Sequence, residues 1–195
     1  MKIDIAVLAS GSGTNLQALI DVPEIRHRIA LVVSDNPDAA ALDRARAHEI
    51  QTAVVRWRDH ADRSSFSREV ADVVEKSGAK GVVLAGFMRI LSPLFIDRFP
   101  NRILNIHPSL LPAFPGTHAV EAALELGVRV TGVTVHFVDE KVDHGPIVAQ
   151  EAVRVESTDT VDTLHRRIQE VEHVLYPRIV RAFINGDLDG QERPR

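Results

Sequence analysis

The chain contains no cysteine. This absence excludes disulfide bonds, zinc sites built from thiolates and cysteine nucleophiles together. It also fits a reducing compartment, so we expect a cytoplasmic location. Aromatic residues are scarce as well, at 5% of the chain.

Long apolar runs are also missing, since no stretch approaches the roughly 20 residues of a membrane span. The N-terminal MKIDIAVLAS is apolar only briefly, is interrupted by Asp4 and leads into glycines, which favours a buried first strand over a signal peptide. The net charge of −4 argues against a broad cationic surface for nucleic acid or an anionic membrane. A local anion site remains compatible with that charge, because loop amides bind phosphate.

The rest of the composition is ordinary for a folded globular protein, and the order of its apolar runs indicates the fold class. With 195 residues, 45% of them apolar and 26% charged, the chain suits a single domain over 1–195. Short apolar runs at 3–9, 29–34, 53–55 and 81–85 alternate with helical patterns at 14–20, 39–48 and 65–76. This alternation predicts a Rossmann-like, mostly parallel sheet flanked by helices.

The pattern changes in the second half. A helix is predicted over 117–126, followed by two strands over 130–138 and 147–155. The short turn between these strands predicts that they are antiparallel. Apolar residues at helical spacing over 161–183, with Gly186 as a C-cap, predict a long C-terminal helix. We expect a polar tail over 189–195.

A glycine-containing loop joins the first strand to the first helix. Glycines allow close approach of a ligand, and a helix N-terminus attracts anions, so this loop is a candidate phosphate site. Its residues are Gly11, Ser12, Gly13, Thr14 and Asn15. A dinucleotide site stays open as an alternative, because Asp35 lies near the end of the second strand, although Leu16 replaces the third glycine of that fingerprint. A simple tight turn also remains possible.

Two polar residues end another strand, in RILNIHPSLLPAFPG over 102–116. Asn105 and His107 are two positions apart, so they are expected on one side of the strand, where an amide and an imidazole suit oxyanion stabilisation and proton transfer. Asp143, in the turn between the late strands, is the candidate third member, and we expect it to raise the pKa of His107. The structural alternative is a strand end that satisfies the proline-rich loop, with Asp143 in an Asx-turn.

With these motifs assembled, the chain resembles the glycinamide ribonucleotide formyltransferases of purine synthesis, over nearly its whole length. The resemblance is carried by LASGSGTNLQALID (8–21), VVLAGFMRILSP (82–93), ILNIHPSLLPAFPGTHA (103–119), GVTVHFVDEKVDHGPIVAQ (132–150) and IQEVEHVLYP (168–177). It implies transfer of the formyl group of 10-formyltetrahydrofolate to the amine of 5′-phosphoribosyl-glycinamide, without a metal. It also implies a monomer or homodimer that acts on small molecules, with neither nucleic acid nor a membrane as partner.

The resemblance also assigns residues to roles. Asn105, His107 and Asp143 match the catalytic trio, and Glu172 joins the loop at 11–15 in holding the substrate. The folate donor is expected to contact Arg63, Met88, Arg89, Ile90, Leu91, Asn105, Val138, Asp139, Glu140 and Asp143. Residues 1–100 would then form the phosphate-binding half and 101–188 the catalytic and folate-binding half. Another folate-dependent formyltransferase, formyltetrahydrofolate hydrolase, a nucleotide-binding module and a dinucleotide oxidoreductase remain alternatives.

Overall fold

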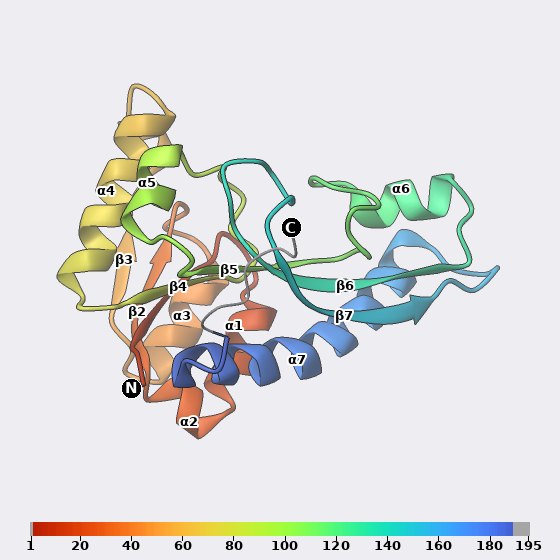
Figure 1. Cartoon of the computed structure of the whole chain (residues 1–195), viewed down its shortest axis with the longest axis horizontal. Coiled ribbons are helices and arrows are strands. Elements are labelled where there is room, and N and C mark those ends of the chain that lie inside the picture. The colour runs from red at the N-terminus through yellow and green to blue at the C-terminus, as the bar shows by residue number, and fades with distance from the viewer. Residues whose placement is uncertain (1, 189–195) are drawn as a thin grey trace.

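Seven strands form one sheet in the order β3-β2-β1-β4-β5-β6-β7 (Figure 1). The computed structural model describes residues 2–188, so the tail expected over 189–195 lies outside the described residues. The strands are β1 (Ile5–Leu8), β2 (Ile29–Ser34), β3 (Thr52–Val54), β4 (Gly81–Leu84), β5 (Ile103–His107), β6 (Val130–Phe137) and β7 (Ile147–Arg154). Strands β1 to β5 run parallel, whereas β6 and β7 pair antiparallel. The predicted fold class is confirmed.

Helices cover both faces of the sheet. They are α1 (Thr14–Ile20), α2 (Pro23–Arg26), α3 (Ala40–Ala47), α4 (Arg63–Lys76), α5 (Pro93–Arg98), α6 (Ala119–Glu125) and α7 (Val161–Asn185), with a 3-10 turn η1 (Trp57–Asp59). Helices α4 and α5 lie together on one side, and α1, α2, α3 and α7 lie on the other (Figure 1). Among the described residues, no helix is both long and apolar enough to cross a membrane.

Strand β1 shows why this sheet has two cores. Its residues are fully buried, and alternate side chains point to opposite faces. Ile5 and Val7 pack with α1, α3 and α7, whereas Ala6 and Leu8 pack with α4 and α5. A strand covered on both faces has no polar side, which is why Ile5–Leu8 is apolar throughout.

The long helix α7 places one polar residue inside the protein. It begins at a capping box in which Thr160 and Thr163 satisfy each other's backbone amides, and it ends at Gly186 with a φ of 82°. Its buried face is mostly apolar, yet Glu172 lies on it. Because α7 packs along α1, this carboxyl group is brought to the loop that precedes α1.

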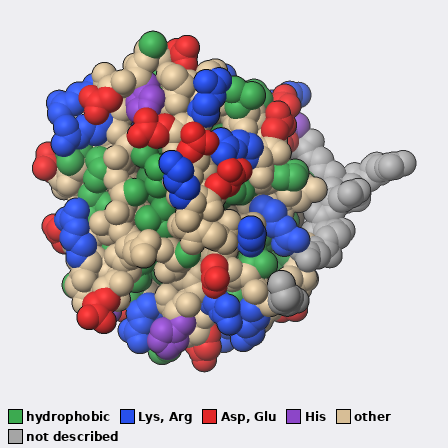
Figure 2. Space-filling view, turned by 90° about the vertical axis from the view of Figure 1, so that its left-hand side faces the viewer, with side chains coloured by type: hydrophobic (Ala, Val, Ile, Leu, Met, Phe, Trp, Pro, Cys, Tyr) green, Lys and Arg blue, Asp and Glu red, His purple; other side chains and the backbone are tan. Residues whose placement is uncertain are grey.

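The outer face of α4 carries mixed charge. Figure 2 views the side of the molecule on which α4 lies and shows basic and acidic side chains interspersed there. Arg98, the last residue of α5, lies 2.7 Å from Asp72 of α4 and also pairs with Glu75 of α4. The charges on this face therefore neutralise one another locally.

Candidate functional site

Strand β5 presents Asn105 and His107 on one face of the sheet. The alternate residues Leu104 and Ile106 are buried in the core beneath α7, so Asn105 and His107 project to the opposite face, as predicted. The antiparallel neighbour β6 sets His136 opposite Asn105 and Thr134 opposite His107. Four polar side chains therefore share this part of an otherwise apolar sheet.

Asp143 lies over this face, in the turn between β6 and β7. Its Oδ2 is 3.4 Å from His107 Nδ1, and its Oδ1 is 3.7 Å from His136 Nε2. The same Oδ2 accepts the Gly116 amide at 2.8 Å. Burial raises the pKa of Asp143, but His136, the Gly116 amide and His107 outweigh it, so the pKa lies below its ordinary value. Asp143 is therefore ionised at neutral pH.

His107 contacts two acceptors. Its Nε2–H donates to the Phe114 carbonyl at 2.8 Å, while its Nδ1 faces Asp143. Burial lowers the pKa of His107, and the Phe114 carbonyl and Asp143, which both raise it, do not overcome that effect. The expectation of a raised pKa for His107 is therefore wrong, because it counted the carboxylate and not the loss of water around the ring.

His136 is a site residue that the sequence analysis missed. Its ring donates from Nδ1 to the Phe137 carbonyl at 2.8 Å, and its Nε2 lies 3.2 Å from the Asn105 amide nitrogen and 3.7 Å from Asp143 Oδ1. His136 thus fixes how the Asn105 side chain is turned. One signal was present in the sequence: the polar pair Asn105 and His107, two positions apart, has a counterpart in Thr134 and His136.

The proline-containing loop 109–116 is tied to the same strands. Thr134 accepts the Leu111 amide at 3.0 Å and donates to the Ser109 carbonyl at 2.6 Å. Gln150 on β7 donates to the Leu111 carbonyl at 2.9 Å. The loop carries both the carbonyl that holds His107 and the amide that holds Asp143, so its anchoring fixes the spacing of those two groups.

The glycine loop and Glu172 meet at the start of α1. Asn15 donates from Nδ2 to the Glu172 carboxylate at 2.9 Å, and Arg44 donates to the Ser12 carbonyl at 2.8 Å. Gly13 has a φ of 70°, and a Cβ there would lie 2.7 Å from the Ala41 backbone, so only glycine fits. Burial raises the pKa of Glu172 to about 7, which the Asn15 hydrogen bond only partly opposes.

Most of the residues expected to bind folate lie in the segment that follows β4 and in the turn between β6 and β7. The Met88 amide donates to Ser10 at 2.8 Å, which joins the segment 86–91 to the glycine loop. Met88 and Ile90 are exposed, at 63% and 56%, whereas Leu91 is buried. The Val138 amide bonds the Ile103 carbonyl at 2.9 Å and anchors the start of the turn that continues through Asp139 and Glu140.

Two predicted residues stand apart. Arg63 is the exposed first residue of α4, and within residues 2–188 no hydrogen bond or ion pair links it to the other candidate residues. Asp35, the acid of the dinucleotide alternative, is 2.6 Å from Arg89. Its carboxylate is thus already engaged by a cation.

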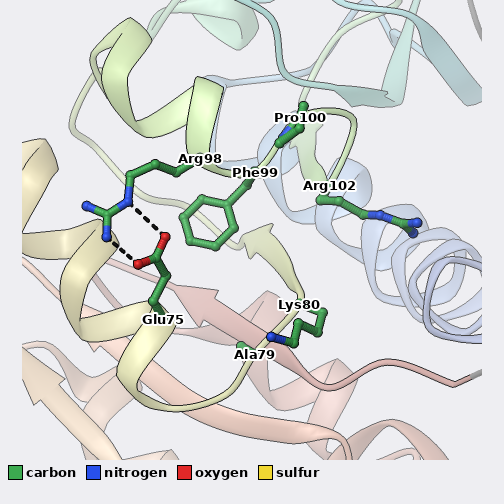
Figure 3. Close-up of a pocket in the computed structure, with 7 residues that line it drawn as sticks. All are labelled: Glu75, Ala79, Lys80, Arg98, Phe99, Pro100 and Arg102. Carbon is green, nitrogen blue, oxygen red and sulfur yellow. Dashed lines mark hydrogen bonds and ion pairs between the residues drawn. The ribbon is translucent and has the colours of Figure 1, made fainter.

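A cavity of about 480 Å³ lies at the other end of the sheet, next to the starts of β4 and β5 (Figure 3). It is lined by Glu75, Ala79, Lys80, Arg98, Phe99, Pro100 and Arg102. The close-up shows the Arg98 guanidinium paired with the Glu75 carboxylate, so this arginine already has a partner. A second cavity, of about 520 Å³, opens between α1 and α7 beside Thr14 and His173. Of the two, only the second touches a predicted site residue.

The chain is similar to a known protein family and to named proteins. The formyl transferase family model matches residues 3–180. Phosphoribosylglycinamide formyltransferase of Escherichia coli is 40% identical over 98% of this chain and 96% of its own length. The trifunctional purine biosynthetic protein adenosine-3 of Gallus gallus is 46% identical, but the chain spans 19% of that protein's length.

Solved structures show the same likeness. A glycinamide ribonucleotide transformylase from Symbiobacterium toebii superposes with a TM-score of 0.93 at 46% identity, over 98% of this chain and 92% of that one. The resemblance found in the sequence motifs is thus confirmed independently by family, relatives and fold. On these matches, the chain belongs to the formyl transferase family.

Proposed function

We propose that this protein transfers the formyl group of 10-formyltetrahydrofolate to the amine of 5′-phosphoribosyl-glycinamide, in purine biosynthesis. The observation that carries the proposal is the position of ionised Asp143, 3.4 Å from His107 and 3.7 Å from His136, with Asn105 on the same face. An amide and an imidazole beside a fixed carboxylate suit an acyl transfer that forms an oxyanion. The names and identities of the full-length relatives support the choice of acceptor.

The acceptor would bind at the start of α1. Loop amides of 11–15 would hold its phosphate, because the first amides of a helix have no partner within the helix. Glu172, bonded to Asn15, would accept a hydroxyl of the ribose. These contacts would direct the glycinamide amine toward Asn105 and His107.

The donor would bind against the segment 86–91 and the turn 138–143. Met88 and Ile90 offer exposed apolar side chains to a flat ring, and backbone groups beside them offer fixed hydrogen bonds. Holding both substrates in one site contributes several kcal/mol through proximity.

In the proposed reaction the neutral amine attacks the formyl carbon, and its carbonyl oxygen becomes anionic. Asn105 donates to that oxygen, and losing such a donor costs about 3 kcal/mol in related sites. His107 is neutral before the reaction, and the developing negative charge favours its protonation. The attacking amine loses one proton and the leaving folate nitrogen gains one, so Asp143 and His107 need to relay only a single proton.

The direct test is an assay of the purified protein with both substrates. Formyl-phosphoribosyl-glycinamide and tetrahydrofolate are expected in equal amounts, and no turnover is expected when phosphoribosyl-glycinamide is omitted. Release of formate under that omission would instead indicate a hydrolase. Stabilisation by NAD(P) without stabilisation by either proposed substrate would favour a dinucleotide enzyme.

A further inference from the structure

In the segment 86–91, which follows β4, every second side chain from Phe87 to Leu91 is held by packing or by an ion pair. Phe87 stacks on Phe66 with ring centroids 6.3 Å apart, and Leu91 is buried. Between them, Arg89 pairs with Asp35. Met88 and Ile90, the intervening residues, are exposed, as is part of the paired Arg89 side chain. Because Phe87, Arg89 and Leu91 are each held in place, they limit where the intervening Met88 and Ile90 can point.

Arg89 is the polar anchor of the three. Its Nε donates to Asp35 Oδ2 at 2.6 Å, and its guanidinium carbon lies 5.5 Å from the centre of the Trp57 ring. A planar guanidinium can satisfy both contacts at once, which an ammonium group cannot do as well. Arg89 is thereby fixed between the end of β2 and η1.

Asp35 is built into the protein rather than exposed on it. The residue is 8% exposed, and within the described chain its second oxygen, Oδ1, is buried without a hydrogen-bond partner. Burying a carboxylate is costly unless a cation compensates it. Arg89 is that cation, and each group therefore strongly constrains the other.

We propose that Asp35 is a positioning residue for the formyl donor: by holding Arg89 against Trp57, it fixes the segment 86–91 with Met88 and Ile90 turned toward the folate ring. This inference rests on the proposed function. It assigns Arg89 the role of an anchor through its side chain, while the backbone beside it faces the donor.

The test uses Asp35→Asn, which keeps the shape of the side chain and removes its charge. The KM for 10-formyltetrahydrofolate and the Kd for tetrahydrofolate, by calorimetry, are expected to rise about tenfold. The kcat and the Kd for phosphoribosyl-glycinamide are expected to stay within about twofold, because within residues 2–188 no hydrogen bond or ion pair joins Asp35 or Arg89 to the trio or to residues 11–15. Arg89→Lys is expected to have the same effect.

Trp57 supplies a second readout, since it is the only tryptophan of the chain. Its emission is expected to change in Asp35→Asn without any ligand, as Arg89 leaves the ring. The matched control is Asp4→Asn, which removes a carboxylate 3.2 Å from Arg28 at the other end of the sheet. That variant is expected to keep the wild-type constants and emission.

Three outcomes would overturn the inference. Wild-type donor affinity in Asp35→Asn would mean that Arg89 needs no anchor. Equal weakening of both substrates, with a lowered unfolding temperature, would mean a general structural role. If the wild-type protein itself fails to bind tetrahydrofolate, the proposed function fails and this inference fails with it. Were Asp35→Asn not to fold, the same measurements on Arg89→Lys decide between these outcomes.

Discussion

His107 Nδ1 faces Asp143 Oδ2 at 3.4 Å, while the other ring nitrogen of His107 donates to the Phe114 carbonyl. A neutral imidazole has one N–H and can donate to only one of these two acceptors. If His107 gains a second proton, that proton lies on Nδ1 and is donated to the Asp143 carboxylate. This pairing leaves His107 neutral through burial but ready to accept a proton when negative charge develops nearby.

The first prediction concerns Asp143→Asn. The asparagine oxygen can still accept the Gly116 amide, so the loop is expected to keep its place. The kcat is expected to fall about 100-fold or more, because the charge that supports proton transfer is lost. The pKa of His107, followed by NMR titration, is expected to fall further, since Asp143 raises it. Wild-type turnover in a correctly folded Asp143→Asn would contradict the catalytic role of Asp143.

A second prediction tests whether His136 acts through Asn105. His136→Ala removes the ring nitrogen that contacts the Asn105 amide, so kcat is expected to fall about tenfold or more with little change in KM. In the double variant with Asn105→Ala, the two losses are expected to be less than additive, because they remove one function. Full additivity in kcat would show that His136 acts independently of Asn105.

The fold was largely predictable because its signals are local. The strand 29–34 and the helix 14–20 have the bounds predicted, since glycines and polar turns mark both ends. The helix predicted from 117 begins instead at Ala119, because His118 has a nonhelical backbone and serves as its N-cap. Helices α2 and α5 were not predicted, since each is too short to show a periodic apolar pattern.

The site was predictable only where a motif carried it. Asn105 and His107 are two apart in sequence, so their shared face follows from strand geometry alone. The contact of Asn105 with His136 spans 31 positions and depends on the register of β5 and β6. The Asp35–Arg89 pair spans 54 positions. Such contacts follow from how elements pack, and no local pattern encodes them.

A third prediction uses the raised pKa of Glu172. Its folded-state pKa of about 7 lies above the ordinary value of 4.5. The folded protein therefore binds more protons than the unfolded chain between those values, and the free energy of unfolding falls as pH rises from about 4.5 to about 7. Glu172→Gln is expected to flatten this dependence and to stabilise the protein at pH 8 by on the order of 3 kcal/mol.

Chemical unfolding at pH 5 and pH 8 measures this effect. Glu170→Gln is the matched control, since Glu170 lies on the same helix and is exposed. It should leave the pH dependence of the wild type in place. An unchanged slope in Glu172→Gln would mean that Glu172 is not the group that titrates.

A fourth prediction compares two glycines of the loop before α1. Gly13→Ala forces a side chain onto a φ of 70° and places its Cβ 2.7 Å from the Ala41 backbone, so it is expected to destabilise the protein by about 1–3 kcal/mol. Gly11→Ala meets nothing within 4 Å and should keep the wild-type unfolding temperature. Thermal unfolding of the two variants side by side measures the difference in their unfolding temperatures. Equal unfolding temperatures would mean that α3 does not pack closely on Gly13.

The last prediction compares two threonines of β6. Thr134 bonds both the Leu111 amide and the Ser109 carbonyl, so Thr134→Val leaves two buried backbone groups unpaired and is expected to cost about 2 kcal/mol or more. Thr131 is equally buried, but its hydroxyl has no hydrogen-bond partner in the described part of the chain. Thr131→Val is therefore expected to be neutral or stabilising, because valine is similar in size to threonine and lacks the unsatisfied hydroxyl.

Hydrogen exchange separates a local effect from a global one. Because Thr134 anchors the loop 109–116, Thr134→Val is expected to raise amide exchange in that loop far more than in β1 or β4, whereas Thr131→Val should not. Uniformly faster exchange across the sheet would mean that Thr134 stabilises the fold in general. Loss of amide protection confined to the loop, together with a lowered kcat, would show that the geometry of His107 and Asp143 depends on the anchoring of Leu111.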